Sequence, residues 1–232
     1  PDIVGDRSLW QEVEVLSWYD RAFADVNLPG VVLKINHRKI LAGIAGLLGA
    51  ESRLVDFTVA LDKIDKIGKE GVFKELSERR FEVDSLSVLN QLLALEGDTE
   101  HQLTELKSLF SNQPEGLEGV EELEFISSQL KENSLHATEL KFDLTLARGL
   151  HYYTGMIVEV APPVQVKMGS IGGGGRYDDL TGVFGLKDMS GIGISFGFER
   201  IYLVMEALDL FPKTLLKRPQ VLFANFGGAA VQ

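Results

Sequence analysis

The spacing of apolar residues changes twice along this chain, and that change limits the folds it can adopt. Residues 9–26 place apolar groups every three or four positions, which is typical of an amphipathic helix, and the β-branched run at 31–35 predicts a short strand. From Arg38 to about Asn133 the pattern is almost wholly helical, and from Leu140 onward the period moves toward two. Strand-bearing regions on both sides of a helical block predict an α+β fold, a mostly antiparallel sheet flanked by helices and carrying an all-helical insertion.

The region after the helical block contains strand-like stretches and one helix. Residues 140–147 alternate in polarity, residues 156–170 contain two β-rich runs, and residues 190–198 form a further run after a turn. A helix is expected at 201–211, and beyond a linker the apolar run at 221–226 looks like the first strand of another domain. We therefore divide the chain into four parts, residues 1–37, 38–138, 139–212 and 213–232.

Composition excludes several classes of protein. The 232 residues are 45% hydrophobic, which is enough for a buried core, and the absence of cysteine removes disulfides, thiolate zinc sites and cysteine nucleophiles. Because no apolar run approaches the roughly 20 residues that span a bilayer, and no secretory signal is visible, we expect a cytoplasmic protein without a membrane partner. A net charge of −11 argues against nonspecific binding to nucleic acid. The start at Pro1 and the apolar run near the end favour a piece of a longer protein.

Arg148 follows the alternating run at 140–147. By parity it shares the apolar side of that run, where an unpaired guanidinium would be costly, so it requires an anion. A bound carboxylate or phosphate would serve, since the planar guanidinium matches both. An internal salt bridge with Asp143 or Glu159 would serve equally well, and both interpretations stay open at this point.

Two neighbouring motifs add tyrosines and glycines. Tyr152 and Tyr153 are adjacent at a predicted strand end and should face opposite sides, one toward the core and one toward a ligand. The four glycines at 172–175 are tolerated where a backbone must approach a ligand or another strand closely. A flexible loop is the alternative, but the Arg-Tyr-Asp at 176–178 favours a pocket wall.

The run at 190–200 carries three glycines among apolar residues and ends in Glu199 and Arg200, where a strand passes into a helix. There Arg200 can reach an anion, and the glycines allow a flat ligand to lie against the backbone. A plain surface pair between Glu199 and Arg200 is the other interpretation.

Metal and serine-hydrolase chemistry find no support in the sequence. The four histidines are scattered without ligand spacing, so no metal site is predicted. Ser195 has no evident histidine and acid partners, and the nucleophile-elbow motif is absent.

Taken together, three stretches resemble histidyl-tRNA synthetases, which are class II aminoacyl-tRNA synthetases. Residues 147–155 (ARGLHYYTG) look like the first histidine-specific motif, residues 172–180 (GGGGRYDDL) like the second, and residues 191–201 (GIGISFGFERI) like class II motif 3. The run at 35–41 is also similar to a family segment. His151 departs from the usual Asp of the first motif, which puts fine specificity in doubt more than the chemistry.

The resemblance implies roles for individual residues. It implies that Arg148 contacts the substrate carboxylate and the α-phosphate, that Arg200 holds the ATP tail phosphates, and that Gly197 lets the adenine lie close. For the histidine side chain it implies a pocket lined by Asp2, Tyr152, Tyr153, Gly173, Gly174 and Tyr177, with Tyr153 as the imidazole contact.

The implied reaction joins histidine to ATP as histidyl-adenylate, with Mg²⁺ on the pyrophosphate, and then transfers histidine to tRNA(His). The resemblance also implies that motif 1 and most of motif 2 would precede Pro1 and that an anticodon-binding domain would follow Gln232. We therefore expect a homodimeric parent protein and a chain that is catalytically incompetent alone.

Two related functions use a similar pattern. The synthetase-like regulatory subunit of ATP phosphoribosyltransferase keeps the fold and the Tyr-Tyr-Thr-Gly sequence, and a tRNA-sensing pseudo-synthetase module keeps the fold without catalysis. The helical block and Arg200 in an intact motif 3 argue against the first, and the presence of both Arg148 and Arg200 argues against the second.

Overall fold

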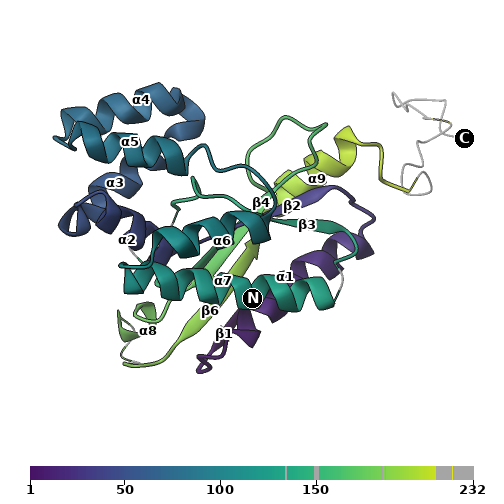
Figure 1. Cartoon of the computed structure of the whole chain (residues 1–232). Coiled ribbons are helices and arrows are strands. Elements are labelled where there is room, and N and C mark those ends of the chain that lie inside the picture. The colour runs from purple at the N-terminus through teal and green to yellow at the C-terminus, as the bar shows by residue number, and fades with distance from the viewer. Residues whose placement is uncertain (134, 149–151, 184, 186, 213–220, 222–232) are drawn as a thin grey trace, which may run out of the picture.

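One mixed sheet organises the protein (Figure 1). The computed structural model describes residues 1–133, 135–148, 152–183, 185, 187–212 and 221. Within this part of the chain six strands pair in the order β1-β6-β5-β4-β2-β3, and every neighbouring pair is antiparallel except β2 and β3. The strands are β1 (Asp2–Val4), β2 (Val31–His37), β3 (Thr138–Phe142), β4 (Met156–Ala161), β5 (Gly172–Arg176) and β6 (Gly191–Phe196).

Helices flank this sheet, as the sequence predicts. The helices are α1 (Trp10–Asp25), α2 (Arg38–Leu47), the 3₁₀ turn η1 (Glu51–Arg53), α3 (Leu54–Leu61), α4 (Ile64–Glu78), α5 (Val83–Leu92), α6 (Thr99–Leu109), α7 (Pro114–Glu132), α8 (Leu180–Val183) and α9 (Phe198–Ala207). The predicted helical block is therefore confirmed as a run of helices. Among the described residues, no helix combines the length and the apolar character that a membrane span requires.

The helical block is the connection between two parallel strands. β2 and β3 are parallel neighbours, so the chain must cross back between them, and α2 to α7 fill that crossover. The imidazole Nδ1 of His37 accepts a hydrogen bond from the backbone N–H of Lys39 and so caps α2. α6 and α7 lie across the sheet, whereas α3, α4 and α5 stand away from it in Figure 1. The boundaries of the four proposed parts stay predictions.

α1 and α7 lie side by side over one face of the sheet. The buried hydroxyl of Tyr19 in α1 donates to the carbonyl oxygens of Gly173 (3.1 Å) and Ser195 (2.8 Å), which ties the helix to β5 and β6. A Cβ added at Gly172 would meet the Tyr19 ring at 3.1 Å, so Gly172 faces α1. Because side chains alternate along a strand, Gly173 and Gly175 face the opposite side, which we call the open face.

Glycines in β5 and β6 allow the strands and the groups above them to approach closely. A Cβ on Gly174 would lie 2.1 Å from the carbonyl oxygen of Gly193, and one on Gly175 would lie 2.5 Å from that of Met156. The glycine run is thus a central strand rather than a flexible loop, and its tolerance for close strand approach is confirmed.

One predicted strand ends early and another does not form. β3 stops at Phe142 because the carboxylate of Asp143 accepts the backbone N–H of Thr145 at 3.0 Å and turns the chain. Residues 163–168, the second β-rich run, instead form turns after Pro163.

The predicted helix at 201–211 begins earlier, at Phe198, and ends at Ala207. The predicted linker and strand beyond residue 212 lie outside the described residues, Val221 excepted.

The start of β3 is held by one carboxylate. Asp20, in α1 and only 5% exposed, accepts the backbone N–H groups of His136, Ala137 and Thr138 and the hydroxyl of Thr138, at 2.8–3.0 Å. These bonds fix the return of the chain from the helical block to the sheet.

We predict that Asp20→Asn lowers the free energy of unfolding by about 1–3 kcal/mol, because the amide loses the charge that strengthens these hydrogen bonds and sets its NH₂ group against the backbone N–H of His136. Urea unfolding at pH 7 measures the loss. Asp25→Asn, at an exposed position at the end of the same helix, serves as the control and should change the stability little. Equal effects at the two positions would contradict the assigned role.

Asp20 should also give an acid limb to the stability. Burial alone raises the pKa of this carboxyl, but the hydrogen bonds from residues 136–138 outweigh it and hold the pKa below its usual range. A depressed folded-state pKa contributes stability above the unfolded value of about 3.9, and the contribution is lost as the pH falls through the folded pKa. The difference between wild type and Asp20→Asn should therefore shrink from pH 7 to pH 3. A difference that stays constant would refute the pKa assignment.

Gly174→Ala should destabilise the fold by about 1–3 kcal/mol or more, since its methyl group would be pressed against the β6 backbone. Gly182→Ala, where an added Cβ meets nothing within 4 Å, is the matched control. Thermal unfolding of both variants tests this, and an unchanged melting temperature for Gly174→Ala would show that β6 can move away.

Candidate active site

The open face carries two adjoining hollows. The arginine hollow, of about 370 Å³, includes Arg148, Ser170 and Arg200 in its lining. The carboxylate hollow, of about 490 Å³, includes Asp2 and Tyr177. Four residues line both hollows, so that together they form one trough over β5 and β6: Tyr152, Tyr153, Gly173 and Ser195.

Asp2 and Tyr177 are joined in the carboxylate hollow. β1 pairs with β6 so that Asp2 lies opposite Gly193, and a Cβ on Gly193 would lie 1.9 Å from the Asp2 carboxylate. The glycine therefore makes room for the acid. The hydroxyl of Tyr177 donates to Asp2 Oδ1 at 2.6 Å, and burial, followed by this hydrogen bond and the Asp2 charge, raises the pKa of the phenol. Tyr177 is thus a protonated donor that fixes one oxygen of the carboxylate.

Tyr152 and Tyr153 border both hollows. The prediction that they face opposite sides of a strand is wrong, because they lie in a turn before β4 and their ring centroids are 4.3 Å apart. Burial, and then the Tyr152 hydroxyl, raises the pKa of Tyr153. The neighbouring residue His151 lies outside the described residues, so its departure from the motif stays untested.

The tyrosine turn is fastened to the end of β5. The backbone N–H of Thr154 donates to the carbonyl of Arg176 at 2.8 Å. The Thr154 hydroxyl and Asp178 exchange hydrogen bonds at 3.0 Å, hydroxyl to carboxylate and backbone N–H to hydroxyl. The two predicted motifs are therefore one connected unit.

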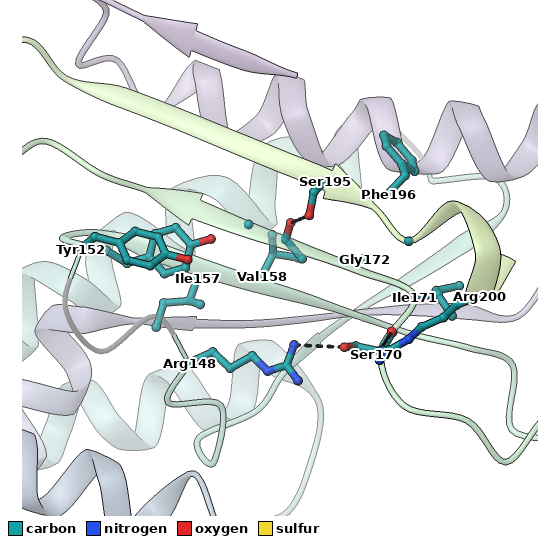
Figure 2. A pocket seen from close by; sticks show the side chains of 14 residues that line it. Arg148, Tyr152, Ile157, Val158, Ser170, Ile171, Gly172, Ser195, Phe196 and Arg200 are labelled. Atoms are coloured by element: carbon teal, nitrogen blue, oxygen red, sulfur yellow. Dashed lines mark hydrogen bonds between the residues drawn. The ribbon is translucent and has the colours of Figure 1, made fainter. Parts of the chain in front are cut away.

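Arg148 does not face the core. Its side chain is 53% exposed, and the parity argument fails because the strand it relied on ends at Phe142. The internal salt bridge is confirmed, since Nε lies 2.7 Å from Glu159, and Nη1 donates to the Ser170 hydroxyl at 3.0 Å (Figure 2). Burial raises the pKa of Glu159, and the charge of Arg148 opposes that rise.

Arg200 enters the same hollow from the first turn of α9. Its Nη1 donates to the carbonyl oxygen of Ser170 at 2.6 Å, and Figure 2 shows its side chain beside Ser170. Gly197, just before the helix, donates its N–H to the carbonyl of Ile171 at 2.8 Å, and a Cβ there would lie 3.0 Å from that oxygen. The close passage of these two backbone segments therefore favours a glycine at this position.

Arg176, expected in a pocket wall, faces the other way. It is 5% exposed and forms an ion pair with buried Glu12 in α1, in which Nη2 lies 2.6 Å from Oε2. Strand parity could have predicted this, because Arg176 shares the side of Gly172, but nothing in the sequence identified Glu12 as its partner.

Sequence patterns indicated some of the remaining residues and not others. Gly174 was expected in the site, and it borders the arginine hollow. No pattern in the sequence indicated Ser170 or Tyr19. Ser195 lines the trough and donates its hydroxyl to the carbonyl of Gly173 at 3.2 Å. Among the described residues no group of three or more histidine, aspartate or glutamate side chains could hold a metal ion.

Comparisons with known proteins indicate the family to which this chain is similar. A family model described as histidyl-tRNA synthetase matches residues 2–201. The histidine–tRNA ligase of Christiangramia forsetii is 54% identical over 226 residues, 97% of this chain and 50% of that protein. The histidyl-tRNA synthetase structure from Nostoc sp. PCC 7120 is 29% identical with a TM-score of 0.82, covering 91% of this chain and 50% of that one.

A third comparison concerns the fold alone. The structure of an ATP phosphoribosyltransferase regulatory subunit/histidyl-tRNA synthetase from Bacillus halodurans C has a TM-score of 0.72 at 23% identity, covering 89% of this chain and 52% of that one. The chain spans about half the length of the curated relatives it matches. Because the family model covers most of the chain, from β1 to α9, the chain belongs to the histidyl-tRNA synthetase family.

Proposed function

We propose that this chain forms part of the catalytic centre of an enzyme that activates histidine with ATP to histidyl-adenylate and passes the histidyl group to tRNA(His). One observation carries the proposal. A single glycine-floored trough has a carboxylate at one end and two guanidinium groups at the other. Histidine has the complementary pattern, a ring with N–H donors and, several atoms away, a carboxylate that must meet a phosphate.

The carboxylate hollow is proposed to select the imidazole. Asp2, with one oxygen held by Tyr177, would accept a ring N–H, and the hydroxyl of Tyr153 would bond the ring from the side. Tyr152 would close the wall and Gly173 would keep the floor flat, with the backbone of Gly174 bordering the arginine hollow. A site built from hydrogen-bonding groups rejects ligands that leave those groups unpaired.

The arginine hollow is proposed to bind the reacting groups. Arg148 would contact the histidine carboxylate and the α-phosphate, and Arg200 the ATP tail phosphates, with the adenine over Gly197. Attack of the carboxylate on the α-phosphorus increases negative charge on the phosphate oxygens, and cations already in place stabilise that charge without rearrangement. Mg²⁺ would bind through ATP oxygens.

The wider setting follows from the family. We propose tRNA(His) as the nucleic-acid partner, a homodimer as the functional assembly and the cytoplasm as the compartment. The regulatory-subunit and tRNA-sensing alternatives share the fold, but neither needs two arginines converging on one residue, as Arg148 and Arg200 do on Ser170.

Calorimetric titration of the 232-residue chain tests the proposal. We expect histidine to bind more tightly than histidinol, which lacks the carboxylate. Phenylalanine should not bind, because its ring offers no N–H donor to Asp2. Asp2→Asn should weaken histidine by about tenfold or more, the equivalent of one hydrogen bond to a charged group. Glu139→Gln, an exposed acid on β3, is the control. Phenylalanine binding as tightly as histidine would refute the assignment.

A further inference from the structure

The guanidinium of Arg148 is held at two of its three nitrogens. Glu159 binds Nε at 2.7 Å and the Ser170 hydroxyl accepts from Nη1 at 3.0 Å. Glu159 is an ion-pair partner at Nε, and Ser170 takes one N–H of Nη1, so the second N–H of Nη1 and both N–H groups of Nη2 are left for a ligand. An anion in the hollow would thus be met end-on, by the two Nη atoms, while the Nε edge stays with Glu159.

Glu159 is well placed to fix this orientation. It lies on β4, in register with Gly173 of β5 on one side and Lys34 of β2 on the other, and its side chain is only 19% exposed. Lys34 is itself paired with Asp143 at 2.8 Å. The carboxylate of Glu159 is therefore available to Arg148, and a central strand is a rigid base for it.

Ser170 links the two arginines. Its hydroxyl accepts from Arg148 and its carbonyl oxygen accepts from Arg200 at 2.6 Å. A single residue thus sets the separation between two guanidinium groups that come from a loop and from α9. Figure 2 shows all three side chains on the same side of the hollow.

A purely stabilising role explains this arrangement poorly. Arg148 is half exposed, and an ion pair with such an exposed partner contributes only about 0–1 kcal/mol to stability. A long side chain that otherwise samples many rotamers nevertheless has two anchors at the border of a hollow. Anchoring lowers the entropy lost when a ligand binds, and this benefit is realised only in binding.

We propose that Glu159 and Ser170 are positioning residues, which hold the guanidinium of Arg148 so that its Nη atoms face the substrate carboxylate. The inference rests on the proposed function, because it assigns that carboxylate to Arg148. It adds two residues that act through the arginine rather than on the substrate.

Two measurements on the 232-residue chain test the inference separately from the function. The arginine Nε–Hε signals are recorded by ¹H–¹⁵N NMR, with Arg148 assigned through its loss in Arg148→Met. We expect restricted motion of the Nε–Hε bond in the wild type, measured as its ¹⁵N order parameter, and larger motion in Glu159→Gln and Ser170→Ala. The matched controls are Glu139→Gln on β3 and Ser87→Ala on α5, both at exposed positions. Thermal unfolding verifies that each variant is folded.

Titration then measures the effect on binding. We expect Glu159→Gln and Ser170→Ala to weaken histidine by about tenfold, the loss typical of one charge-assisted contact, with histidinol affinity unchanged. In an Arg148→Met background neither substitution should weaken histidine further.

The outcomes separate the two ideas. An Nε–Hε bond that is equally mobile in wild type and variants overturns the positioning role, as does an equal loss of affinity for histidine and histidinol. A restricted Nε–Hε bond in a chain that does not distinguish histidine from histidinol overturns the proposed contact with the carboxylate instead, while the two anchors of Arg148 are supported. If Glu159→Gln fails to fold, Ser170→Ala decides the question.

Discussion

The absence of side chains on the open face of β5 and β6 is the constraint on which the candidate site depends. A Cβ at Gly193, on the open face of β6, would lie 1.9 Å from the Asp2 carboxylate, far inside van der Waals contact. β5 and β6 therefore provide a floor whose one side-chain functional group is the Ser195 hydroxyl. The charged groups reach the trough from around this floor, Asp2 from β1, Arg148 from a loop and Arg200 from α9. A flat substrate can then be recognised around its perimeter while its face lies on the backbone.

A buried ion pair on the other face keeps that edge in place. Burial raises the pKa of Glu12, which opposes its charge, but the hydrogen bonds and charge of Arg176 act against that rise. Breaking such a pair is costly because it leaves an uncompensated charge inside the protein. Arg176 also donates to the Ser190 hydroxyl, which in turn donates to Asp178, the partner of Thr154. This chain of contacts runs from α1 through the sheet to the tyrosine turn, so the turn is anchored to the buried face of the sheet.

Sequence periodicity could predict the α+β architecture because each element has a face that must be buried, and α1, β2 and the helical block reproduce their patterns. It could also indicate which motifs gather, since glycines and arginines in unusual settings restrict the possible roles. It could not predict the orientation of Arg148, because Asp143 turns the backbone just after Phe142 and resets the alternation. The sequence could not predict the pairing of Arg176 with Glu12 for another reason, since it joins residues 164 positions apart.

The arginine hollow is positively charged although the chain as a whole is acidic. A net charge of −11 repels phosphates at long range, but salt screens that repulsion beyond about 8–10 Å. The charged residues that line the arginine hollow are Arg148 and Arg200, and Glu159 reduces this local positive charge without removing it. Glu159 occupies Nε and so leaves the Nη atoms of Arg148 to determine where an anion can bind. The acid therefore makes the site less positive but more directional, which suits a reaction that depends on alignment of a carboxylate with a phosphate.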